Sequence, residues 1–237
     1  MDVNSPDLGH PLDNPVWSAL SGAQAGLAEV ACIDGASAGR YRSDVCPFGA
    51  IEDSNNPAGW AALASLLEGR ATCVFVAPAL VPAGWEVVTA IPGVQMDGTG
   101  LEPADDADAV MLTEADVPEM LALVERTRPG PYLRRTIEMG RYMGIRRGGE
   151  LVAMAGERMH PSGWTELSAV CTDDRFRGKG LGTRLVRAVA AGVRGRSELP
   201  FLHASADNLN AIRLYEALGF TLRRTCSFTI VKPLVTN

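Results

Sequence analysis

The stretch TELSAVCTDDRFRGKGLGTRLVRAVAAGV, residues 165–193, contains the most informative pattern for the fold of this chain. Residues 165–172 have the composition of a buried strand, and residues 180–193 have the apolar spacing of a helix. Between them, RGKGLG at residues 177–182 holds three glycines and two cations. Because glycine inside a helix costs roughly 1 kcal/mol relative to alanine, glycines at a helix start indicate that backbone N–H groups are presented to a ligand. The simplest such ligand is an anion.

Two common phosphate-binding motifs do not match this loop. A Walker A loop requires a serine or threonine after its lysine, and Lys179 is followed by Gly180. A dinucleotide-binding fingerprint requires a third glycine at a position that this sequence does not fill with glycine. The remaining pattern is R-x-x-G-x-G at Arg177, Gly180 and Gly182, with a strand before it and a helix after it.

This pattern, together with NAIRLYEALGF at residues 210–220, resembles the GNAT superfamily of N-acetyltransferases, which bind acetyl-CoA through such a loop. The resemblance covers residues 107–237. The details MAGERM, TELSAVCT and PFLH are most similar to the subgroup related to glycine N-acyltransferases. Consecutive N–H groups at a helix start, with the helix dipole and nearby cations, suit the pyrophosphate of CoA without a metal ion.

The resemblance implies roles for individual residues. Glu166 matches the glutamate that serves as base in several members, and Tyr215 matches the tyrosine that protonates or hydrogen-bonds the CoA sulfur. The residues implied in CoA binding are Val170, Cys171, Thr172, Arg177, Gly178, Lys179, Gly180, Leu181, Gly182, Thr183 and Asn208. Strand periodicity predicts Glu166, Ser168, Val170 and Thr172 on one face and Leu167, Ala169 and Cys171 on the other.

Structural alternatives exist for each of these residues. Glu166 would then be an exposed residue at a strand start, Tyr215 a core tyrosine, and Asn208 a helix cap. His203 is a second candidate for the base. A thiol hydrolase with Cys171, His203 and Asp207 is a further alternative, although no neighbour that would lower the pKa of Cys171 is evident.

The acceptor site is expected near RTRPGPYLRRTIEMGRY, residues 126–142. Arg134, Arg135 and Arg141 are candidates to bind an acceptor carboxylate, and solvated arginines are the alternative. The acceptor is expected to be a primary amine of a small molecule or an amino acid. The sequence names neither the acceptor nor the length of the acyl group.

The order of predicted elements indicates an α/β fold with a mixed sheet and hairpins. A boundary in the Gly/Pro/Asp-rich residues 97–109 divides the chain into an acidic, non-catalytic domain, 1–106, and an acetyltransferase domain, 107–237. The first domain is expected to be a scaffold or a degenerate copy of the same fold. Within it, helices are predicted at residues 14–31 and 59–69, and residues 71–94 are predicted as two buried strands rather than a membrane span.

Charge and cysteine content limit the function classes. Residues 1–106 carry 3 Lys+Arg against 14 Asp+Glu, and residues 107–237 carry 19 against 14, so the stated net charge of −6 is the sum of −11 and +5. A basic half in an acidic chain favours a local anionic ligand over nucleic acid. Five scattered cysteines without a CxxC pair indicate neither a disulfide framework nor a zinc site. The N-terminus lacks signal-peptide features, so a cytoplasmic protein with no membrane partner is expected, either monomer or homodimer.

The sequence therefore predicts an N-acyltransferase that moves an acyl group, expected to be acetyl, from CoA to an amine by direct attack in a ternary complex. Direct attack is favoured because no well-placed nucleophile is evident. The alternative is a non-catalytic CoA-binding sensor or interaction module.

Overall fold

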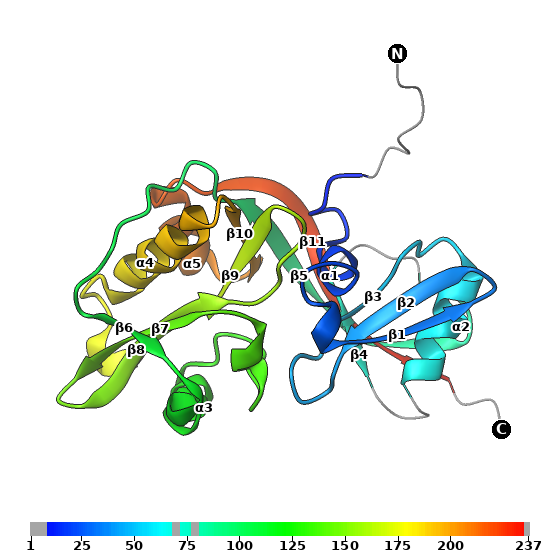
Figure 1. Cartoon of the computed structure of the whole chain (residues 1–237), viewed down its shortest axis with the longest axis horizontal. Coiled ribbons are helices and arrows are strands. Elements are labelled where there is room, and N and C mark those ends of the chain that lie inside the picture. The colour runs from blue at the N-terminus through cyan, green and yellow to red at the C-terminus, as the bar shows by residue number, and fades with distance from the viewer. Residues whose placement is uncertain (1–8, 68–71, 77–80, 235–237) are drawn as a thin grey trace, which may run out of the picture.

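The computed structural model describes residues 9–67, 72–76 and 81–234, which fold into two lobes joined by two long strands (Figure 1). The elements of the N-terminal half are α1 Pro15–Leu20, β1 Ala28–Ile33, β2 Ala36–Tyr41, β3 Gly49–Ile51, α2 Pro57–Leu66, β4 Cys73–Phe75 and β5 Trp85–Asp97. Those of the C-terminal half are β6 Ala109–Leu112, α3 Val117–Thr127, β7 Tyr142–Arg147, β8 Glu150–Glu157, β9 Trp164–Thr172, α4 Leu181–Gly195, β10 Leu199–Ser205, α5 Leu209–Ala217 and β11 Thr221–Pro233.

The strands form two sheets. One contains β1-β2-β3, and the other has the order β4-β11-β5-β10-β9-β8-β7-β6. In the larger sheet β9 and β10 are parallel, and the other neighbours are antiparallel. The predicted α/β class with a mixed sheet is confirmed.

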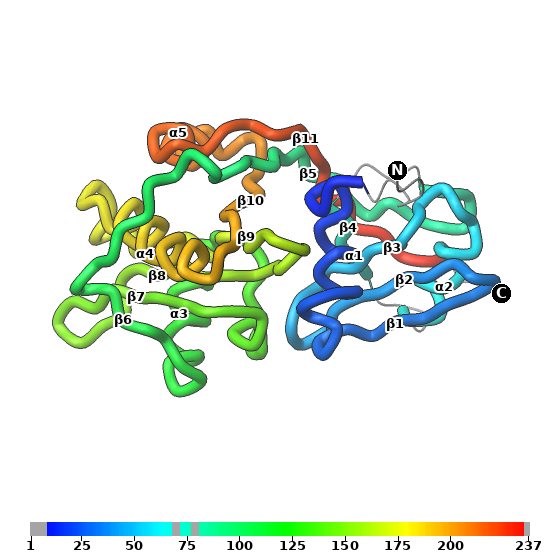
Figure 2. The backbone as a smooth tube through the Cα atoms, turned by 45° about the horizontal axis from the view of Figure 1, so that its top comes forward, coloured from blue at the N-terminus to red at the C-terminus, as the bar shows by residue number. Residues whose placement is uncertain are grey.

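The two halves repeat one order of elements. In each half an antiparallel meander (β1-β2-β3 or β7-β8-β9) is followed by a helix, a strand parallel to the last meander strand, and a strand of 13 residues, β5 or β11; in the C-terminal half helix α5 precedes this last strand. These two long strands are exchanged: β5 pairs with β10 of the C-terminal half, and β11 pairs with β4 of the N-terminal half. Figure 2 shows β5 and β11 running side by side from one lobe to the other.

The exchange bears on the predicted domain boundary. The boundary between residues 106 and 107 falls in the segment before β6, and the eight-stranded sheet contains strands from both sides of it. Helix α1 ends at Leu20, and residues 28–31 of the helix predicted over 14–31 are strand β1, so that prediction is wrong in its second half. Gly22 and Gly26 lie between the two elements and disfavour helix continuation.

Two further predictions in the N-terminal half have mixed outcomes. Helix α2 confirms the helix predicted over 59–69 for its described part. Strands β4 and β5 confirm the two strands predicted within residues 71–94. Residues 86–92 are exposed rather than buried, because they cross between the lobes. Residues 71 and 77–80 lie outside the described residues. Among the helices of the described ranges, none is both long and apolar enough to cross a membrane.

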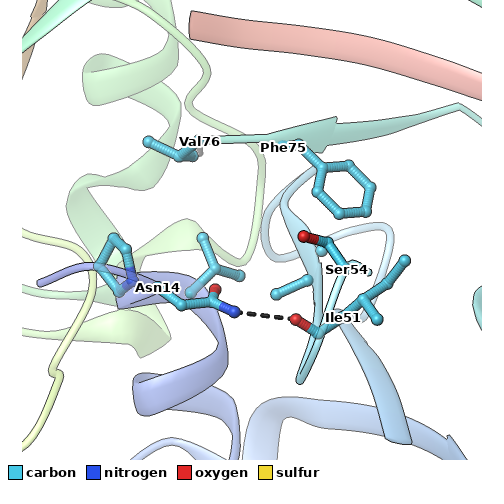
Figure 3. Close-up of a pocket in the computed structure, with 9 residues that line it drawn as sticks. Asn14, Ile51, Ser54, Phe75 and Val76 are labelled. Atoms are coloured by element: carbon cyan, nitrogen blue, oxygen red, sulfur yellow. Dashed lines mark hydrogen bonds between the residues drawn. The ribbon is translucent and has the colours of Figure 1, made fainter. Parts of the chain in front are cut away.

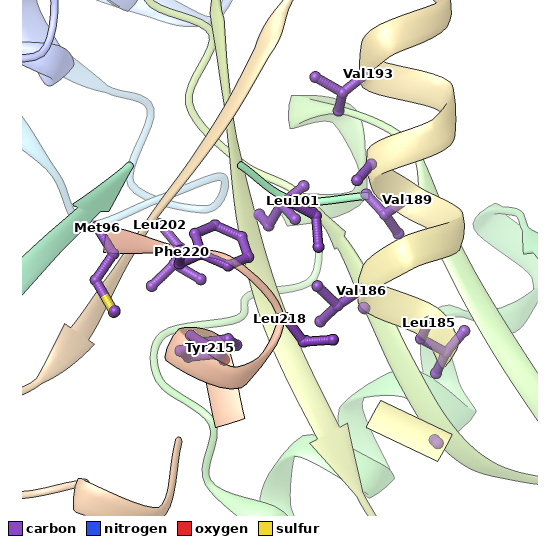
Figure 4. Packing of buried hydrophobic residues seen from close by; sticks show 14 of the residues in the cluster. Met96, Leu101, Leu185, Val186, Val189, Val193, Leu202, Tyr215, Leu218 and Phe220 are labelled. Carbon is purple, nitrogen blue, oxygen red and sulfur yellow. The ribbon is translucent and has the colours of Figure 1, made fainter. Parts of the chain in front are cut away.

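The core of the C-terminal lobe lies between α4 and the sheet (Figure 4). The stripe predicted on this helix is confirmed, with Leu181, Leu185, Val189 and Val193 at 4, 0, 3 and 0% exposure. Burying a side chain of this size contributes about 1.5–3 kcal/mol, so the stripe fixes the direction in which α4 begins. A second core joins the lobes and includes residues from α1, β4, β9 and β10.

Candidate active site

Strands β9 and β10 separate and open a cleft in the C-terminal half. Their parallel pairing begins at Leu199↔Trp164 and ends at Phe201↔Glu166, and the described residues contain no further β9–β10 pair. From Leu167 onward, the β9 edge that faces β10 carries peptide groups without a strand partner on that side. The resulting cleft has a volume of about 700 Å³ and is lined by both strands, α5, and the loop before α4. A chain of amide groups could hydrogen-bond along this edge.

A β-bulge in β9 shapes the cleft wall. Ala169 has φ 53°, and the β8–β9 register shifts between Met154 and Gly156. A non-glycine residue in the left-handed region costs about 1–2 kcal/mol, and such bulges are frequent beside active sites. The predicted alternation is wrong here, because Leu167 packs in the α4 core whereas Ala169 and Cys171 pack in the α3 core.

The glycine loop lies at one end of the cleft. Gly178 and Gly180 both have φ 73°, a conformation that favours glycine, and Gly180 is the N-cap of α4 without a side-chain cap hydrogen bond. The first N–H groups of the 15-residue helix therefore remain available to an anion. The predicted residues that line the cleft are Val170, Cys171, Thr172, Arg177, Gly178, Gly180, Leu181, Gly182, Thr183, Asn208 and Tyr215.

The cations around the loop differ in their contacts. Lys179 does not line the cleft; its Nζ lies 4.9 Å from the centre of the Phe176 ring. Arg177 lines the cleft and pairs with Asp174 at 2.8 Å. Arg184 in the first turn of α4 is held by Asp106 at 2.5 and 2.7 Å, which ties the segment before β6 to this helix.

Asn208 at the start of α5 and Tyr215 within it both line the cleft. Asn208 accepts a hydrogen bond from the Ala211 N–H at 3.2 Å, so it is a helix cap as well. Tyr215 is 8% exposed, and its ring packs edge-on against Phe220 with centroids 5.7 Å apart (Figure 4). Burial raises the pKa of Tyr215 to about 12. Its hydroxyl therefore remains a hydrogen-bond donor at any working pH.

Glu166 does not line the cleft: it lies where the β9–β10 pairing ends, beside the cleft, and is fully buried in an ion pair. Its two oxygens accept hydrogen bonds from Arg158 Nε and Nη2, both at 2.7 Å, and Oε1 also contacts His203 Nδ1 at 2.7 Å. Burial alone would raise the pKa of Glu166, but the charge and hydrogen bonds of Arg158, with the bond from His203, lower it to about 2. A carboxylate with this pKa holds a proton weakly, and its side chain is 0% exposed.

The network continues from His203 to the N-terminal half. His203 Nε2 lies 3.0 Å from the side-chain nitrogen of Gln95, which also donates to the Leu12 carbonyl at 2.9 Å. Because an amide nitrogen can only donate, Nε2 is the acceptor and Nδ1–H donates to Glu166. Gln95 Oε1 in turn accepts from Arg223 at 2.7 Å. Both ring nitrogens of His203 are thus occupied.

The alternative with a reactive thiol has little support in this geometry. Burial raises the pKa of Cys171 to about 11, so its thiol stays protonated. His203 is engaged with Glu166 and Gln95, and Asp207 accepts a hydrogen bond from the Ser205 hydroxyl at 2.6 Å. These residues do not form a nucleophile–base pair.

The three acceptor arginines do not line the cleft. Arg134 and Arg135 border a separate hollow beside α3, and Arg135 is neutralised by Glu138 and Asp44 at 2.5 and 3.0 Å. Arg141 donates its backbone N–H to the Glu157 carboxylate at 3.2 Å. The cleft instead contains the neighbouring residues 127–131 of the same loop, together with Arg158.

Sequence reasoning missed a set of apolar lining residues from outside the acetyltransferase motifs. They are Phe48, Val74, Ile91, Phe228 and Ile230. Three of the five belong to residues 1–106: Val74 and Ile91 are brought to the cleft by the pairing of β4 and β5 with β11, and Phe48 lies beside Val74. The sequence indicates that these residues belong to apolar segments typical of β-strands, but such a pattern does not indicate which lobe a side chain faces.

The corresponding opening in the N-terminal lobe is filled. The space between β3 and β4 is only about 30 Å³, room for about one water molecule. Helix α1 plugs it, and the Asn14 side chain donates to the Ile51 carbonyl at 2.8 Å (Figure 3). Where the C-terminal half has a glycine loop before α4, the segment before α2 contains Asp53, and the Asn56 side chain caps α2 by accepting a hydrogen bond from the Ala58 N–H. This lobe therefore lacks the features that suit a polyphosphate within its described residues.

Comparison with known proteins gives consistent similarities. Residues 142–229 match the family described as FR47-like protein. A crystal structure of a GNAT-family protein from Novosphingobium aromaticivorans has 41% sequence identity and a TM-score of 0.85, covering 96% of this chain and 100% of that chain.

Two curated relatives match a shorter part of the chain. A mycothiol acetyltransferase from Corynebacterium efficiens is 38% identical over 76 residues, which are 32% of this chain and 26% of that protein. The N-alpha-acetyltransferase RimI from Mycobacterium tuberculosis is 35% identical over 83 residues, 33% of this chain and 51% of that protein. The chain thus matches about a quarter and about half of the length of these two relatives.

Proposed function

The chain belongs to the GNAT family, and on this premise we propose that it transfers an acetyl group from acetyl-CoA to a primary amine. The GNAT-family crystal structure matches 96% of the chain, and the two curated relatives are acetyltransferases. The observation that carries the proposal is the cleft between β9 and β10, with uncapped N–H groups of α4 at one end and the Tyr215 side chain along its wall.

The cleft residues fit acetyl-CoA as co-substrate. The N–H groups from Gly178 to Thr183, with Arg177, would hold the pyrophosphate, and the open edge of β9 would bond the amides of the pantetheine arm. Acetyl-CoA supplies an acyl group activated as a thioester. The amine nitrogen bonds to the acyl carbon, the carbon–sulfur bond breaks, and one amine proton ends on the CoA sulfur.

Tyr215 would stabilise the departing sulfur by a hydrogen bond. A thiol has a pKa of about 8.5, well below the value of about 12 to which burial raises the pKa of Tyr215. Complete proton transfer from Tyr215 to a thiolate is therefore uphill. A hydrogen bond from the phenol still lowers the energy of the developing negative charge.

Glu166 is better suited to positioning than to proton transfer. Its oxygens are held by Arg158 and His203, and the low pKa of the carboxylate makes it a poor acceptor for an ammonium proton. We propose that the ammonium form of the acceptor first loses a proton to solvent in the cleft and that the resulting free base attacks. We further propose that Glu166 holds β9 and β10 in register where their pairing ends. The role of general base stays a prediction for this residue.

The test is amine-dependent release of CoA thiol, measured with a thiol-reactive dye and by mass of the N-acetyl product. We expect stoichiometric thiol and product with at least one amine from a panel of monoamines, amino acids and polyamines. Tight CoA binding without thiol release across this panel would support a non-catalytic CoA-binding module instead.

A further inference from the structure

The apolar residues brought to the cleft by strand exchange share one face of the sheet. On β11, Phe228 and Ile230 are two residues apart, so their side chains point to the same face. Ile91 of β5 is the cross-strand partner of Phe228, and Val74 of β4 is the partner of Ile230. Directly paired residues lie on one face, so all four form a continuous surface, which we term the apolar wall.

This wall adjoins the base of the cleft. The Phe228 ring lies edge-on to His203 with centroids 6.1 Å apart, and Phe48 lies beside Val74 through a parallel bridge. Arg158 stacks over Phe48 at 4.6 Å, and its charge is neutralised by Glu166. The cleft surface around the wall is therefore apolar, and its nearest cation is already paired.

The lining of the cleft also has a uniform sign of charge. Among the described residues that line it, the charged side chains are Arg128, Arg158 and Arg177, and none is aspartate or glutamate. A cationic group placed against the wall would lose part of its hydration shell without gaining a carboxylate. Burying an ammonium without a partner is unfavourable, because desolvation is not offset by an ion pair.

We propose that the acceptor is an amine with an apolar body and no second positive charge, and that the apolar wall selects it. This inference rests on the proposed acetyl transfer. It gives residues 1–106 a part in choosing the acceptor, because Val74 and Ile91 belong to the wall. Polyamines and other polycationic acceptors are disfavoured by the same surface.

The test uses a matched pair of acceptors and a matched pair of variants. Hexylamine and pentane-1,5-diamine have the same number of heavy atoms, and they differ in a terminal methyl group against an ammonium. The wild type should prefer hexylamine by about 100-fold in kcat/KM, since the diamine must bury an unpaired charge. Ile91→Glu places a carboxylate on the wall and should shift this ratio toward the diamine by about 10-fold or more.

Ile91 is 42% exposed, so a glutamate there can remain partly hydrated and the protein should fold. Val87→Glu is the control, because Val87 lies on the same strand at 46% exposure and does not line the cleft. It should leave the hexylamine-to-diamine ratio unchanged. Equal use of both amines by the wild type, or the same shift in both variants, would overturn the proposal.

Two additional readouts separate this inference from the proposed function. Hexylamine binding to the CoA-loaded protein is measured by ligand-observed NMR, where its methyl protons should receive saturation in the wild type and lose it in Ile91→Glu. Binding without any thiol release would refute acetyl transfer but keep the apolar acceptor site. If Ile91→Glu instead alters only the preference for acetyl-CoA over hexanoyl-CoA, the wall holds the acyl chain and the proposal is refuted.

Discussion

Replacing Glu166 with glutamine should destabilise the protein by about 3 kcal/mol at pH 7. The pKa of this carboxyl is about 2 in the folded chain against an ordinary value of 4.5. At 1.36 kcal/mol per pH unit, this difference corresponds to about 3 kcal/mol of stabilisation of the charged form. The value agrees with the cost of about 3–5 kcal/mol for breaking a buried ion pair, which here would leave Arg158 buried and unpaired.

The assay is urea denaturation followed by circular dichroism, with wild type and variant compared across pH. Because the folded-state pKa of Glu166 lies below its unfolded value, its contribution is complete above about pH 4.5 and is lost as the pH falls toward 2. The difference between wild type and Glu166→Gln should thus be constant from pH 7 to pH 5 and shrink below that range. Other acidic groups cancel in this difference.

Two controls isolate the ion pair. Glu150→Gln removes a carboxylate that is 46% exposed and paired with Arg175, and it should cost less than about 1 kcal/mol. The double variant Arg158→Met with Glu166→Leu removes both charges and should recover most of the stability lost in Glu166→Gln. If Glu166→Gln is as stable as wild type at pH 7, or if the difference does not depend on pH between 5 and 3, the assigned role of the ion pair is refuted.

The remaining predictions concern binding and turnover. Gly180→Asp should weaken CoA binding by about 100-fold or more in calorimetry, because φ at this position is 73° and the added carboxylate would repel the anion. The control Gly195→Asp, at the other end of α4, should bind CoA as the wild type does. Equal CoA affinity of the two variants would contradict the assignment of the loop. Tyr215→Phe should lower kcat by about 10-fold or more and leave the CoA affinity unchanged. The dependence of kcat on pH should also be unchanged up to pH 10, because burial raises the pKa of the Tyr215 hydroxyl to about 12. A shift in the basic limb of this pH profile would count against the hydrogen-bond role. With two amines of equal size and different pKa, the acidic limb of kcat/KM should follow the pKa of the amine; a limb fixed at one pH for both would indicate a base in the protein.

The elements of the C-terminal half could be predicted from local sequence. The helix-capping segment TEAD at residues 113–116, the turn RGGE at residues 147–150 and the apolar stripe of residues 181–193 each determine structure over a short distance. The elements built on them, α3, the β7–β8 hairpin and α4, are observed. The glycine loop was readable for the same reason, since a positive φ at Gly178 and Gly180 is a local requirement.

Features that depend on distant segments could not be predicted. The exchange of β5 and β11 depends on pairing between residues more than a hundred positions apart, and strand periodicity does not specify the partner. The bulge at Ala169 reverses the faces of β9 without a glycine to signal it. The ion pair between Arg158 and Glu166 lies across a turn, so Glu166 was expected to be available for proton transfer although it is fully buried.

A crystal structure with acetyl-CoA bound is the most direct test of the account. We expect the pyrophosphate within hydrogen-bond distance of the N–H groups of residues 178–183, the pantetheine arm along the β9 edge beyond Leu167, and the sulfur within reach of the Tyr215 hydroxyl. Acetyl-CoA bound outside the β9–β10 cleft, or inside it with its sulfur remote from Tyr215, would contradict the account.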